Sequence, residues 1–293
     1  MKRIIYYILT LSLFLITLTS SAQSWKFLRN EFSFGLGASN FFGELGGADR
    51  IGSHNIKGIT DIDFKATKPA VQIGYRRFFS ANIAVRANFT FGQVSGSDAF
   101  TKEVFRRNRN LSFRSPIAEL AVQVDYFPFR EYFGHLYRSN GVVGKRVNHF
   151  SPYLFAGIGG FYFNPKAKYN GKWVALRPLK TEGVSYSKFS VALPVGIGLK
   201  YAIDRQWSVG LEVGLRFTFT DYIDDVSTVY VDKSNASPME QYLANPALNE
   251  EGNPSWTAPG QQRGSSQAND SYTFAIFTLN YKLLRGRLNL PKF

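Results

Sequence analysis

Eight segments of the chain alternate between large apolar side chains and small or polar ones, and this periodicity constrains the fold more than any other feature. They cover residues 31–40, 69–79, 83–94, 116–127, 151–163, 189–202, 207–220 and 271–284. A period of two residues indicates a β-strand. A tilted strand that crosses a lipid bilayer needs about 9–11 residues, which is the scale of these segments. The pattern therefore predicts membrane-spanning strands.

The polar side of these strands is unusually rich in glycine. In segment 207–220, for example, Gly210 and Gly214 lie on the opposite side to Leu211 and Val213. A soluble β-sandwich also alternates, but small residues on the polar face suit the crowded interior of a narrow barrel. Aromatic residues make up 16% of the sequence, and they cluster near the segment ends as interfacial girdles do. We predict an all-β fold, an eight-stranded antiparallel up-and-down transmembrane β-barrel with a filled lumen.

The connections between the segments alternate in length. Residues 80–82 and 204–206 predict tight periplasmic turns, whereas the connections after segments one, three, five and seven are long, as extracellular loops are. An even number of strands then places both termini in the periplasm. Residues 128–150 break this pattern, because they form a long connection on the periplasmic side. In the longest extracellular loop, 221–270, the sequence Ser237-Pro238-Met239-Glu240 resembles a capping box and predicts one short helix.

The N-terminus has the pattern of a secretory signal peptide. Lys2 and Arg3 precede an apolar run, and Ser20-Ser21-Ala22 offers small residues for cleavage. Residues 1–22 are therefore predicted to be removed, and 23–293 to form the barrel with a periplasmic tail at 285–293; a short membrane anchor is the alternative. The formal net charge is +14. A basic exported chain is expected to meet outer-membrane lipid, lipopolysaccharide or an acidic protein face, and no nucleic acid.

Seven charged residues are predicted to point into the barrel. They are Arg76, Arg86, Glu119, Asp125, Lys200, Glu212 and Arg216. The interior of an eight-stranded barrel is only wide enough for side chains to fill it. Buried charges must then pair, because an unpaired buried ion costs several kcal/mol. We expect a structural network of ion pairs, with a narrow conduit or proton path as the alternative.

Three carboxylates lie close together after the seventh segment, at Asp221, Asp224 and Asp225. Oxygen ligands of this kind can bind Ca²⁺, and paired acids can hydrolyse glycosides. Neighbouring carboxylates on a strand would point in opposite directions, and no partner acid for catalysis is identifiable. We expect hydrogen bonding at the rim of the barrel, with a loop ion site as the alternative.

Two groups of basic residues lie outside the barrel wall. Arg106, Arg107 and Arg109, followed by Arg114, belong to a predicted extracellular loop that either faces anionic lipid head groups or is simply solvated. The second group occupies the periplasmic connection and tail, where aromatic residues are interleaved with it, and is a candidate docking surface for a partner protein. Its members are Arg130, Arg138, Lys145, Arg146, Arg285 and Arg287. A turn that merely folds under the barrel is the alternative.

The composition excludes most catalytic chemistries. The chain has no cysteine and three histidines, so cysteine nucleophiles and thiolate metal sites are ruled out. No serine–histidine–aspartate arrangement or metal-histidine spacing is present. The glycines of 157–160 lie within a strand instead of opening a helix, as a nucleotide loop would. We predict a non-enzymatic protein with no catalytic residue, no cofactor and no metal cofactor.

Seven short sequence motifs, in their order along the chain, are more specific than the overall composition. They are 40–45 (NFFGEL), 92–98 (GQVSGSD), 109–115 (RNLSFRS), 152–159 (PYLFAGIG), 163–167 (FNPKA), 178–183 (PLKTEG) and 220–227 (TDYIDDVS). Together they resemble the PorG-like family of Bacteroidetes outer-membrane barrels, many of them uncharacterised, from about residue 31 to 230 and again in the eighth segment. Phe41 and Glu44 stand where that family is expected to have Tyr and Asp, and the loop after Ser234 lacks a clear match.

The resemblance implies an eight-stranded outer-membrane barrel that serves the type IX secretion system, which also supports gliding motility in some relatives. Such a barrel would sit over a periplasmic ring built from a lipoprotein and its partner protein, and the family brings no catalytic residues. We therefore expect a Gram-negative outer-membrane protein that is an accessory or anchoring component of type IX secretion. A small porin or ligand-binding barrel, a surface-interaction barrel and an outer-membrane lipase or protease are the alternatives. The sequence leaves the oligomeric state open.

Overall fold

A computed structural model describes residues 29–45, 66–101, 103–129, 149–248, 253–266 and 268–283 of the 293-residue chain. The strands are β1 (Asn30–Phe42), β2 (Lys68–Phe78), β3 (Ile83–Ser97), β4 (Ser112–Tyr126), β5 (Phe150–Phe163), β6 (Lys166–Tyr169), β7 (Lys172–Ala175), β8 (Phe189–Ala202), β9 (Trp207–Thr218) and β10 (Ser271–Leu283). The helices are α2 (Val104–Arg109) and α3 (Pro238–Ala244), with short 3-10 turns η3 (Asp98–Phe100), η4 (Arg177–Leu179) and η5 (Pro254–Thr257).

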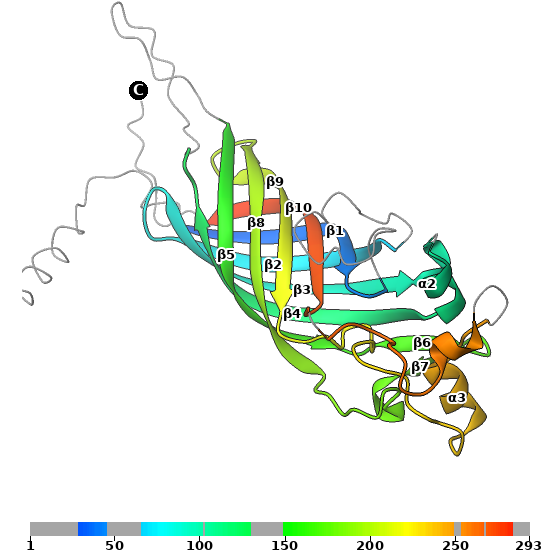
Figure 1. Ribbon diagram of the computed structural model, residues 1–293. Coiled ribbons are helices and arrows are strands. Elements are labelled where there is room, and N and C mark those ends of the chain that lie inside the picture. The colour runs from blue at the N-terminus through cyan, green and yellow to red at the C-terminus, as the bar shows by residue number, and fades with distance from the viewer. Residues whose placement is uncertain are drawn as a thin grey trace, which may run out of the picture.

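Eight of the strands, each 11 to 15 residues long, form a closed antiparallel barrel (Figure 1). Each barrel strand pairs with the next one along the chain, and β5 pairs with β8 because the small β6–β7 hairpin lies between them. Strands β1 and β10 close the barrel, in register from Asn30↔Leu283 to Phe42↔Ser271. The predicted fold class, an eight-stranded up-and-down barrel, is confirmed.

The side chains alternate across the barrel wall as the sequence predicts. In β3, Ile83, Phe89 and Phe91 are exposed on the outside, whereas Arg86 and Asn88 are buried inside. Every barrel strand carries at least one exposed large apolar side chain. Examples, one from each strand in chain order, are Phe32, Ile73, Phe89, Leu120, Leu154, Ile197, Leu211 and Phe277. The outer wall is therefore apolar, as it is in barrels that face lipid.

In the described parts of the chain, no helix combines the length and the apolar character needed to cross a membrane.

The two ends of the barrel differ, and we call them the turn end and the loop end. At the turn end, residues 79–83 and 203–207 close tight turns, with Phe79 N–H donating to Ile83 O at 3.0 Å and Ile203 N–H to Trp207 O at 3.0 Å. Helix α2, the β6–β7 hairpin and α3 lie together at the loop end, on the far side of the barrel from these turns (Figure 1).

The strand boundaries agree with the predicted segments to within four residues. The largest difference is between β3 and β4, whose pairing continues from Val94↔Ser115 to Ser97↔Ser112. Val94, where the predicted segment ends, and Phe113, on the extension, are buried in the apolar cluster at the loop end. Packing against that cluster thus extends the hairpin beyond the segments that alternation alone identifies.

Helix α3 begins where the capping box predicts it. The Ser237 hydroxyl accepts from Glu240 N–H, and the Glu240 carboxylate accepts from Ser237 N–H. The hairpin β6–β7 was not predicted, although its two-residue turn, Asn170-Gly171, is the sequence that favours a tight hairpin. Both residues have positive φ, 46° and 80°. Leu243 of α3 then packs against the hairpin and its flanks.

The lumen is filled along its length. An aromatic cluster lies at the turn end, where Phe127 stacks on Tyr153 with ring centroids 4.8 Å apart and packs against Phe78 and Phe155. A larger apolar cluster that includes Phe41, Phe161 and Phe274 occupies the loop-end half. Charged side chains lie between these two clusters, and they form the first candidate site.

Candidate functional site

Six buried charges in the turn-end half of the barrel form what we call the lumen network. Its members are Glu31, Arg76, Arg86, Asp125, Lys200 and Glu212, all with less than 5% of their surface exposed. Arg76 donates from Nη1 to Glu31 Oε1 and from Nε to Asp125 Oδ2, both at 2.6 Å. Lys200 Nζ donates to the other oxygen of Glu31 at 2.5 Å. Glu31 therefore joins two cations that come from different sides of the barrel.

Arg86, on the neighbouring strand β3, completes the lumen network. Its Nε lies 3.2 Å from Asp125 Oδ2, its Nη1 pairs with Glu212 Oε1, and its Nη2 donates to Gln123 Oε1 at 2.8 Å. Because Arg76 and Arg86 are direct cross-strand neighbours, their like charges would repel without the carboxylates between them. The three cations and three carboxylates of these six residues balance, and the buried Lys282, opposite Glu31 on β10, also acts electrostatically on Glu31.

A separate pair lies nearer the loop end. Arg216 Nε is 3.4 Å from Glu119 Oε2, and the Tyr272 hydroxyl donates to the same oxygen at 2.7 Å. The Arg216 guanidinium also lies 4.7 Å from the centre of the Phe274 ring. All seven charges that we predicted to point inward are thus buried in the barrel and ion-paired.

Sequence reasoning missed one member of the lumen network, Glu31. It opens the first predicted segment and shares its side of the strand with Ser33, Gly35, Gly37 and Ser39. These small residues mark the inward face of β1, so the alternation itself carried the signal. Arg130, Arg138, Lys145, Arg146, Arg285 and Arg287, the signal segment 1–22 and the tail 285–293 lie outside the described residues.

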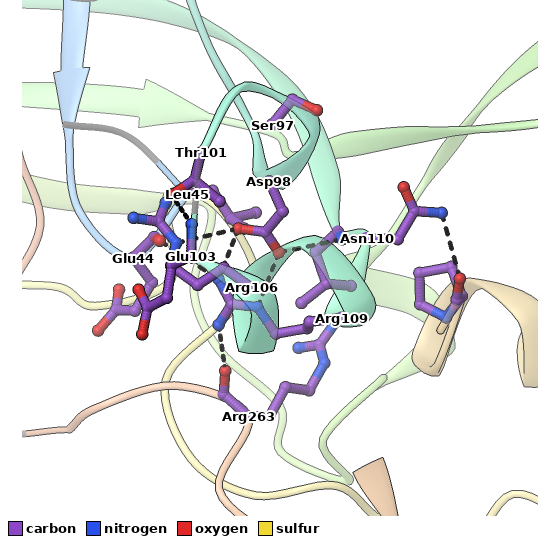
Figure 2. Close-up of polar contacts among 12 residues, drawn as sticks. Glu44, Leu45, Ser97, Asp98, Thr101, Glu103, Arg106, Arg109, Asn110 and Arg263 are labelled. Carbon is purple, nitrogen blue, oxygen red and sulfur yellow. Dashed lines mark hydrogen bonds and ion pairs between the residues drawn. The ribbon is translucent and has the colours of Figure 1, made fainter. Parts of the chain in front are cut away.

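The basic run after β3 has a different role from the one expected. Figure 2 shows Arg106 and Arg109 of α2 converging on Asp98. Arg109 Nε lies 2.7 Å from Asp98 Oδ2, and its Nη1 donates to Arg263 O at 2.5 Å. Only 4% of Arg109 is exposed, so the prediction of a solvated or lipid-facing loop is wrong for this residue.

Arg114 also has a local partner. Its guanidinium stacks 3.7 Å from the centre of the Trp173 ring of β7. A contact this short is well within the range of a cation–π interaction. It links β4, next to the rim, with the β6–β7 hairpin. The basic side chains at the loop end therefore contribute to the loop structure itself.

The acidic side chains after β9, Asp221, Asp224 and Asp225, point to two different places. Asp225 has a positive φ of 68° and accepts from Thr181 Oγ1 at 2.5 Å and from the Tyr186 hydroxyl at 2.6 Å. The Arg263 guanidinium faces it at 3.9 Å and pairs with Glu182 at 2.9 Å. Burial raises the pKa of Asp225 to about 6 despite these partners. Asp225 thus belongs to a network that joins the two long loops.

Asp224 and Asp221 instead meet acids from two other segments. Carboxylate oxygens of Glu44, Asp224 and Asp270 all lie within 4.8 Å of one another. Burial, followed by the charge of the neighbouring Glu44, raises the pKa of Asp221 to about 8. Burial also raises the pKa of Glu44, to about 7, and those of Asp224 and Asp270 well above the usual range. We call Glu44, Asp221, Asp224 and Asp270 the loop carboxylates.

A partly open cavity of about 320 Å³ reaches this region from the loop end. Asp224 and Arg263 line it together with Lys168 of β6 and Tyr242 of α3. Of the three acids predicted as a loop ion site, the structure brings Asp221 and Asp224 together and directs Asp225 elsewhere. Glu44 and Asp270 were not predicted, because they lie far away in the sequence.

Comparisons with known proteins place the chain in a family without a known activity. Residues 3–237 match the family described as "Domain of unknown function (DUF6089)". No curated protein matches the chain.

Solved structures of bacterial surface barrels are similar at low sequence identity. Neisserial surface protein A (NspA) has a TM-score of 0.40 and 9% identity, over 87% of this chain and 96% of that one. The outer membrane protein OprG from Pseudomonas aeruginosa gives 0.36 and 8%, over 88% and 98%. E. coli Outer Membrane Protein W gives 0.35 and 15%, over 87% and 99%.

Proposed function

Because the chain belongs to the DUF6089 family, whose function is unknown, we propose a function from the barrel and its sequence. The protein is a non-enzymatic outer-membrane barrel that serves type IX protein secretion, and the gliding linked to it, as an accessory or anchoring component. The observation that carries this proposal is the lumen, which ion pairs and aromatic rings fill. Because its interior is filled, the barrel is expected to interact with other molecules at its two ends.

The outer-membrane location is supported by the wall of the barrel. Its strands are 11 to 15 residues long, enough for a tilted crossing of a bilayer. The outward side chains are large and apolar on every strand, and a closed barrel leaves no unpaired backbone groups within the lipid. In this proposal the turn end faces the periplasm, with both termini, and the loop end faces outward.

The link to type IX secretion is supported by the seven sequence motifs that resemble PorG-like barrels. In the mechanism that we propose, the barrel fixes a periplasmic ring of a lipoprotein and its partner to the membrane. The contact runs through residues 128–150 and the tail 285–293, whose basic and aromatic side chains suit a docking surface.

Deletion of the gene in its native host tests this function. We expect coordinated loss of proteins that share a C-terminal secretion signal from the supernatant and cell surface, with rescue by the wild-type gene. An unchanged secretome with an intact envelope would contradict the proposal.

Charge reversal then tests the docking surface. Replacement of Arg130, Arg138, Lys145 and Arg146 by Glu should release a co-purifying ring while the barrel remains in the membrane. The matched control reverses the exposed loop-end lysines Lys168, Lys172 and Lys180, and should keep the ring. Continued co-purification with the first variant would refute this interface.

A second candidate, a surface-interaction barrel, is favoured by the ordered loop end. The β6–β7 hairpin, α3 and the cavity of about 320 Å³ form a structured surface there. Replacement of the exposed Tyr242 by Ala should then reduce attachment of cells to a surface or partner cell, with secretion unchanged. Attachment equal to that of wild type would remove this candidate.

A further inference from the structure

The loop carboxylates come from three segments that are distant in the sequence. Glu44 follows β1, Asp221 and Asp224 follow β9, and Asp270 directly precedes β10. The carboxylate oxygens of Glu44, Asp224 and Asp270 lie within 4.8 Å of one another, and Asp221 is close enough to interact electrostatically with all three. Only 1% of Asp224 and of Asp270, and 9% of Asp221, is exposed.

Arg109 is near enough to act electrostatically on Glu44 and Asp224, but no cation of the described residues forms an ion pair with this cluster. The guanidinium groups nearby are engaged elsewhere, since Arg106 and Arg109 pair with Asp98 and Arg263 pairs with Glu182 and Asp225. Among the described residues, none of the ion pairs includes a loop carboxylate. Like charges this close, and this far from water, cannot all remain ionised without a cation.

Several oxygens of these side chains also lack a partner. Neither oxygen of Asp221 accepts a hydrogen bond from the described residues, and the same holds for Asp270 Oδ1 and Glu44 Oε2. The Ser227 hydroxyl is near enough to lower the pKa of Asp221 in part, but it does not reach hydrogen-bond geometry. Buried polar atoms in native proteins nearly always have a partner, so these oxygens point to a ligand.

The backbone holds the carboxylates in place from behind. Val226 N–H donates to Asp224 Oδ1 at 3.0 Å, Ile223 N–H to Asp270 Oδ2 at 2.8 Å, and Ser265 N–H to Glu44 Oε1 at 3.2 Å. In Asp270 and Glu44 the second oxygen is the one without a partner. Each of these two acids thus has one oxygen fixed by the chain and one available.

Gly43 fits the same arrangement. A Cβ at this position would lie 2.3 Å from Asp270 Oδ1 and 2.5 Å from the Phe41 ring. The unpartnered oxygen of Asp270 therefore points toward the backbone next to Glu44, and glycine provides the space for it.

We propose that Glu44, Asp224 and Asp270 bind one divalent cation of the calcium class, with the carboxylate of Asp221 beside them. Ca²⁺ takes oxygen ligands from carboxylates, backbone carbonyls and water in flexible geometry, whereas zinc sites rely on histidine and cysteine. Asp224 lines the cavity at the loop end, which gives an ion a route from solvent. A bound ion would join the loop after β1, the loop after β9 and the start of β10, and so fix the loops over the barrel.

Calorimetric titration of CaCl₂ into the full chain, refolded in non-ionic detergent without lipopolysaccharide and freed of metal by EDTA, tests the site. We expect one ion per chain for wild type. The double substitution Asp224→Asn and Asp270→Asn should weaken binding at least about tenfold, because it removes two ligand charges. Asp232→Asn, an exposed acid in the loop that follows, is the matched control and should bind as wild type does.

A second variant protects the test against misfolding. Glu44 is only half-buried, so Glu44→Gln should keep the barrel, judged by its heat-modifiable mobility in gels, and still weaken binding. Absence of binding to wild type at about 10 mM Ca²⁺, above the range of weak extracellular calcium modules, would overturn the proposal. Equal affinities of wild type, Glu44→Gln and the double variant would overturn it as well.

Discussion

The lumen network and the loop carboxylates are both buried sets of charges, but they are balanced in different ways. In the lumen, three carboxylates face three cations at short range, for example Arg76 with Glu31 and Asp125 at 2.6 Å. At the loop end, Glu44, Asp224 and Asp270 face one another within 4.8 Å. The charges of the lumen network balance one another, whereas the loop carboxylates form no ion pair with any cation of the described residues.

The difference follows from what positions the side chains. Lumen residues stand on paired strands, whose register fixes which charges meet, as Glu31 meets Arg76 across β1 and β2. The loop carboxylates stand on irregular segments that share no register, so loop packing and hydrogen bonds from the backbone hold them together. At an effective dielectric constant of about 20, two like charges about 5 Å apart repel by about 3 kcal/mol. The loop carboxylates therefore favour the binding of a cation or of protons. The paired charges of the lumen instead form a rigid plug.

The largest effect is expected from breaking the balance of the lumen. Arg76→Met leaves Glu31 with Lys200 and Asp125 with Arg86 as the remaining cation, and removal of one partner from a buried ion pair costs about 3–5 kcal/mol. Guanidinium unfolding in detergent micelles should show this loss of stability. Arg77→Met, on the exposed neighbouring position, is the control and should change stability little. Equal stability of the two variants would mean that the network is not needed for the barrel.

A smaller effect is expected at the Glu119–Arg216 pair. Arg216→Met removes the cation, but the Tyr272 hydroxyl still donates to Glu119 at 2.7 Å, so the cost should be about 1–3 kcal/mol. Adding Glu119→Gln to that variant should restore part of the loss, because it removes the unpaired charge. A double-mutant cycle measured by the same unfolding experiment gives the coupling. Strictly additive losses would show that the two side chains do not interact.

The smallest effect on stability, with a clear effect on binding, is expected from Gly43→Ala. The added Cβ would meet Asp270 Oδ1 at 2.3 Å and should displace that oxygen from the loop carboxylates. We expect weaker Ca²⁺ binding and a loss of stability of about 1 kcal/mol, because the added Cβ also meets the buried Phe41 ring at 2.5 Å. Gly160→Ala, where an added Cβ meets nothing within 4 Å, is the matched control. Unchanged Ca²⁺ binding by Gly43→Ala would show that Asp270 Oδ1 is not a ligand of the proposed ion.

The sequence predicts the barrel well because its signal is local. Alternation fixes the strands to within four residues, and the capping box at Ser237 fixes the start of α3. The hairpin β6–β7 could have been predicted from Asn170-Gly171, and Glu31 from the small residues on its side of β1.

The loop end is harder to predict because its contacts are long-range. Glu44 accepts from Ser265 N–H across 221 residues, and Asp224 accepts from Leu45 N–H across 179. No local pattern in the sequence predicts contacts between segments this far apart. The burial of Arg109, which sequence reasoning took for an exposed basic residue, has partly the same origin, since Asp98 belongs to the same loop but Arg263 lies 154 residues away.

Conductance in planar lipid bilayers tests the central claim, a closed and self-neutralised lumen, most directly. The wild-type protein, with insertion verified by protease protection, should add no stepwise current at moderate voltage, because ion pairs and aromatic rings fill the barrel. Reproducible open-channel steps that scale with salt concentration would contradict this account, since they would require a continuous path for ions past Arg76, Arg86 and Lys200.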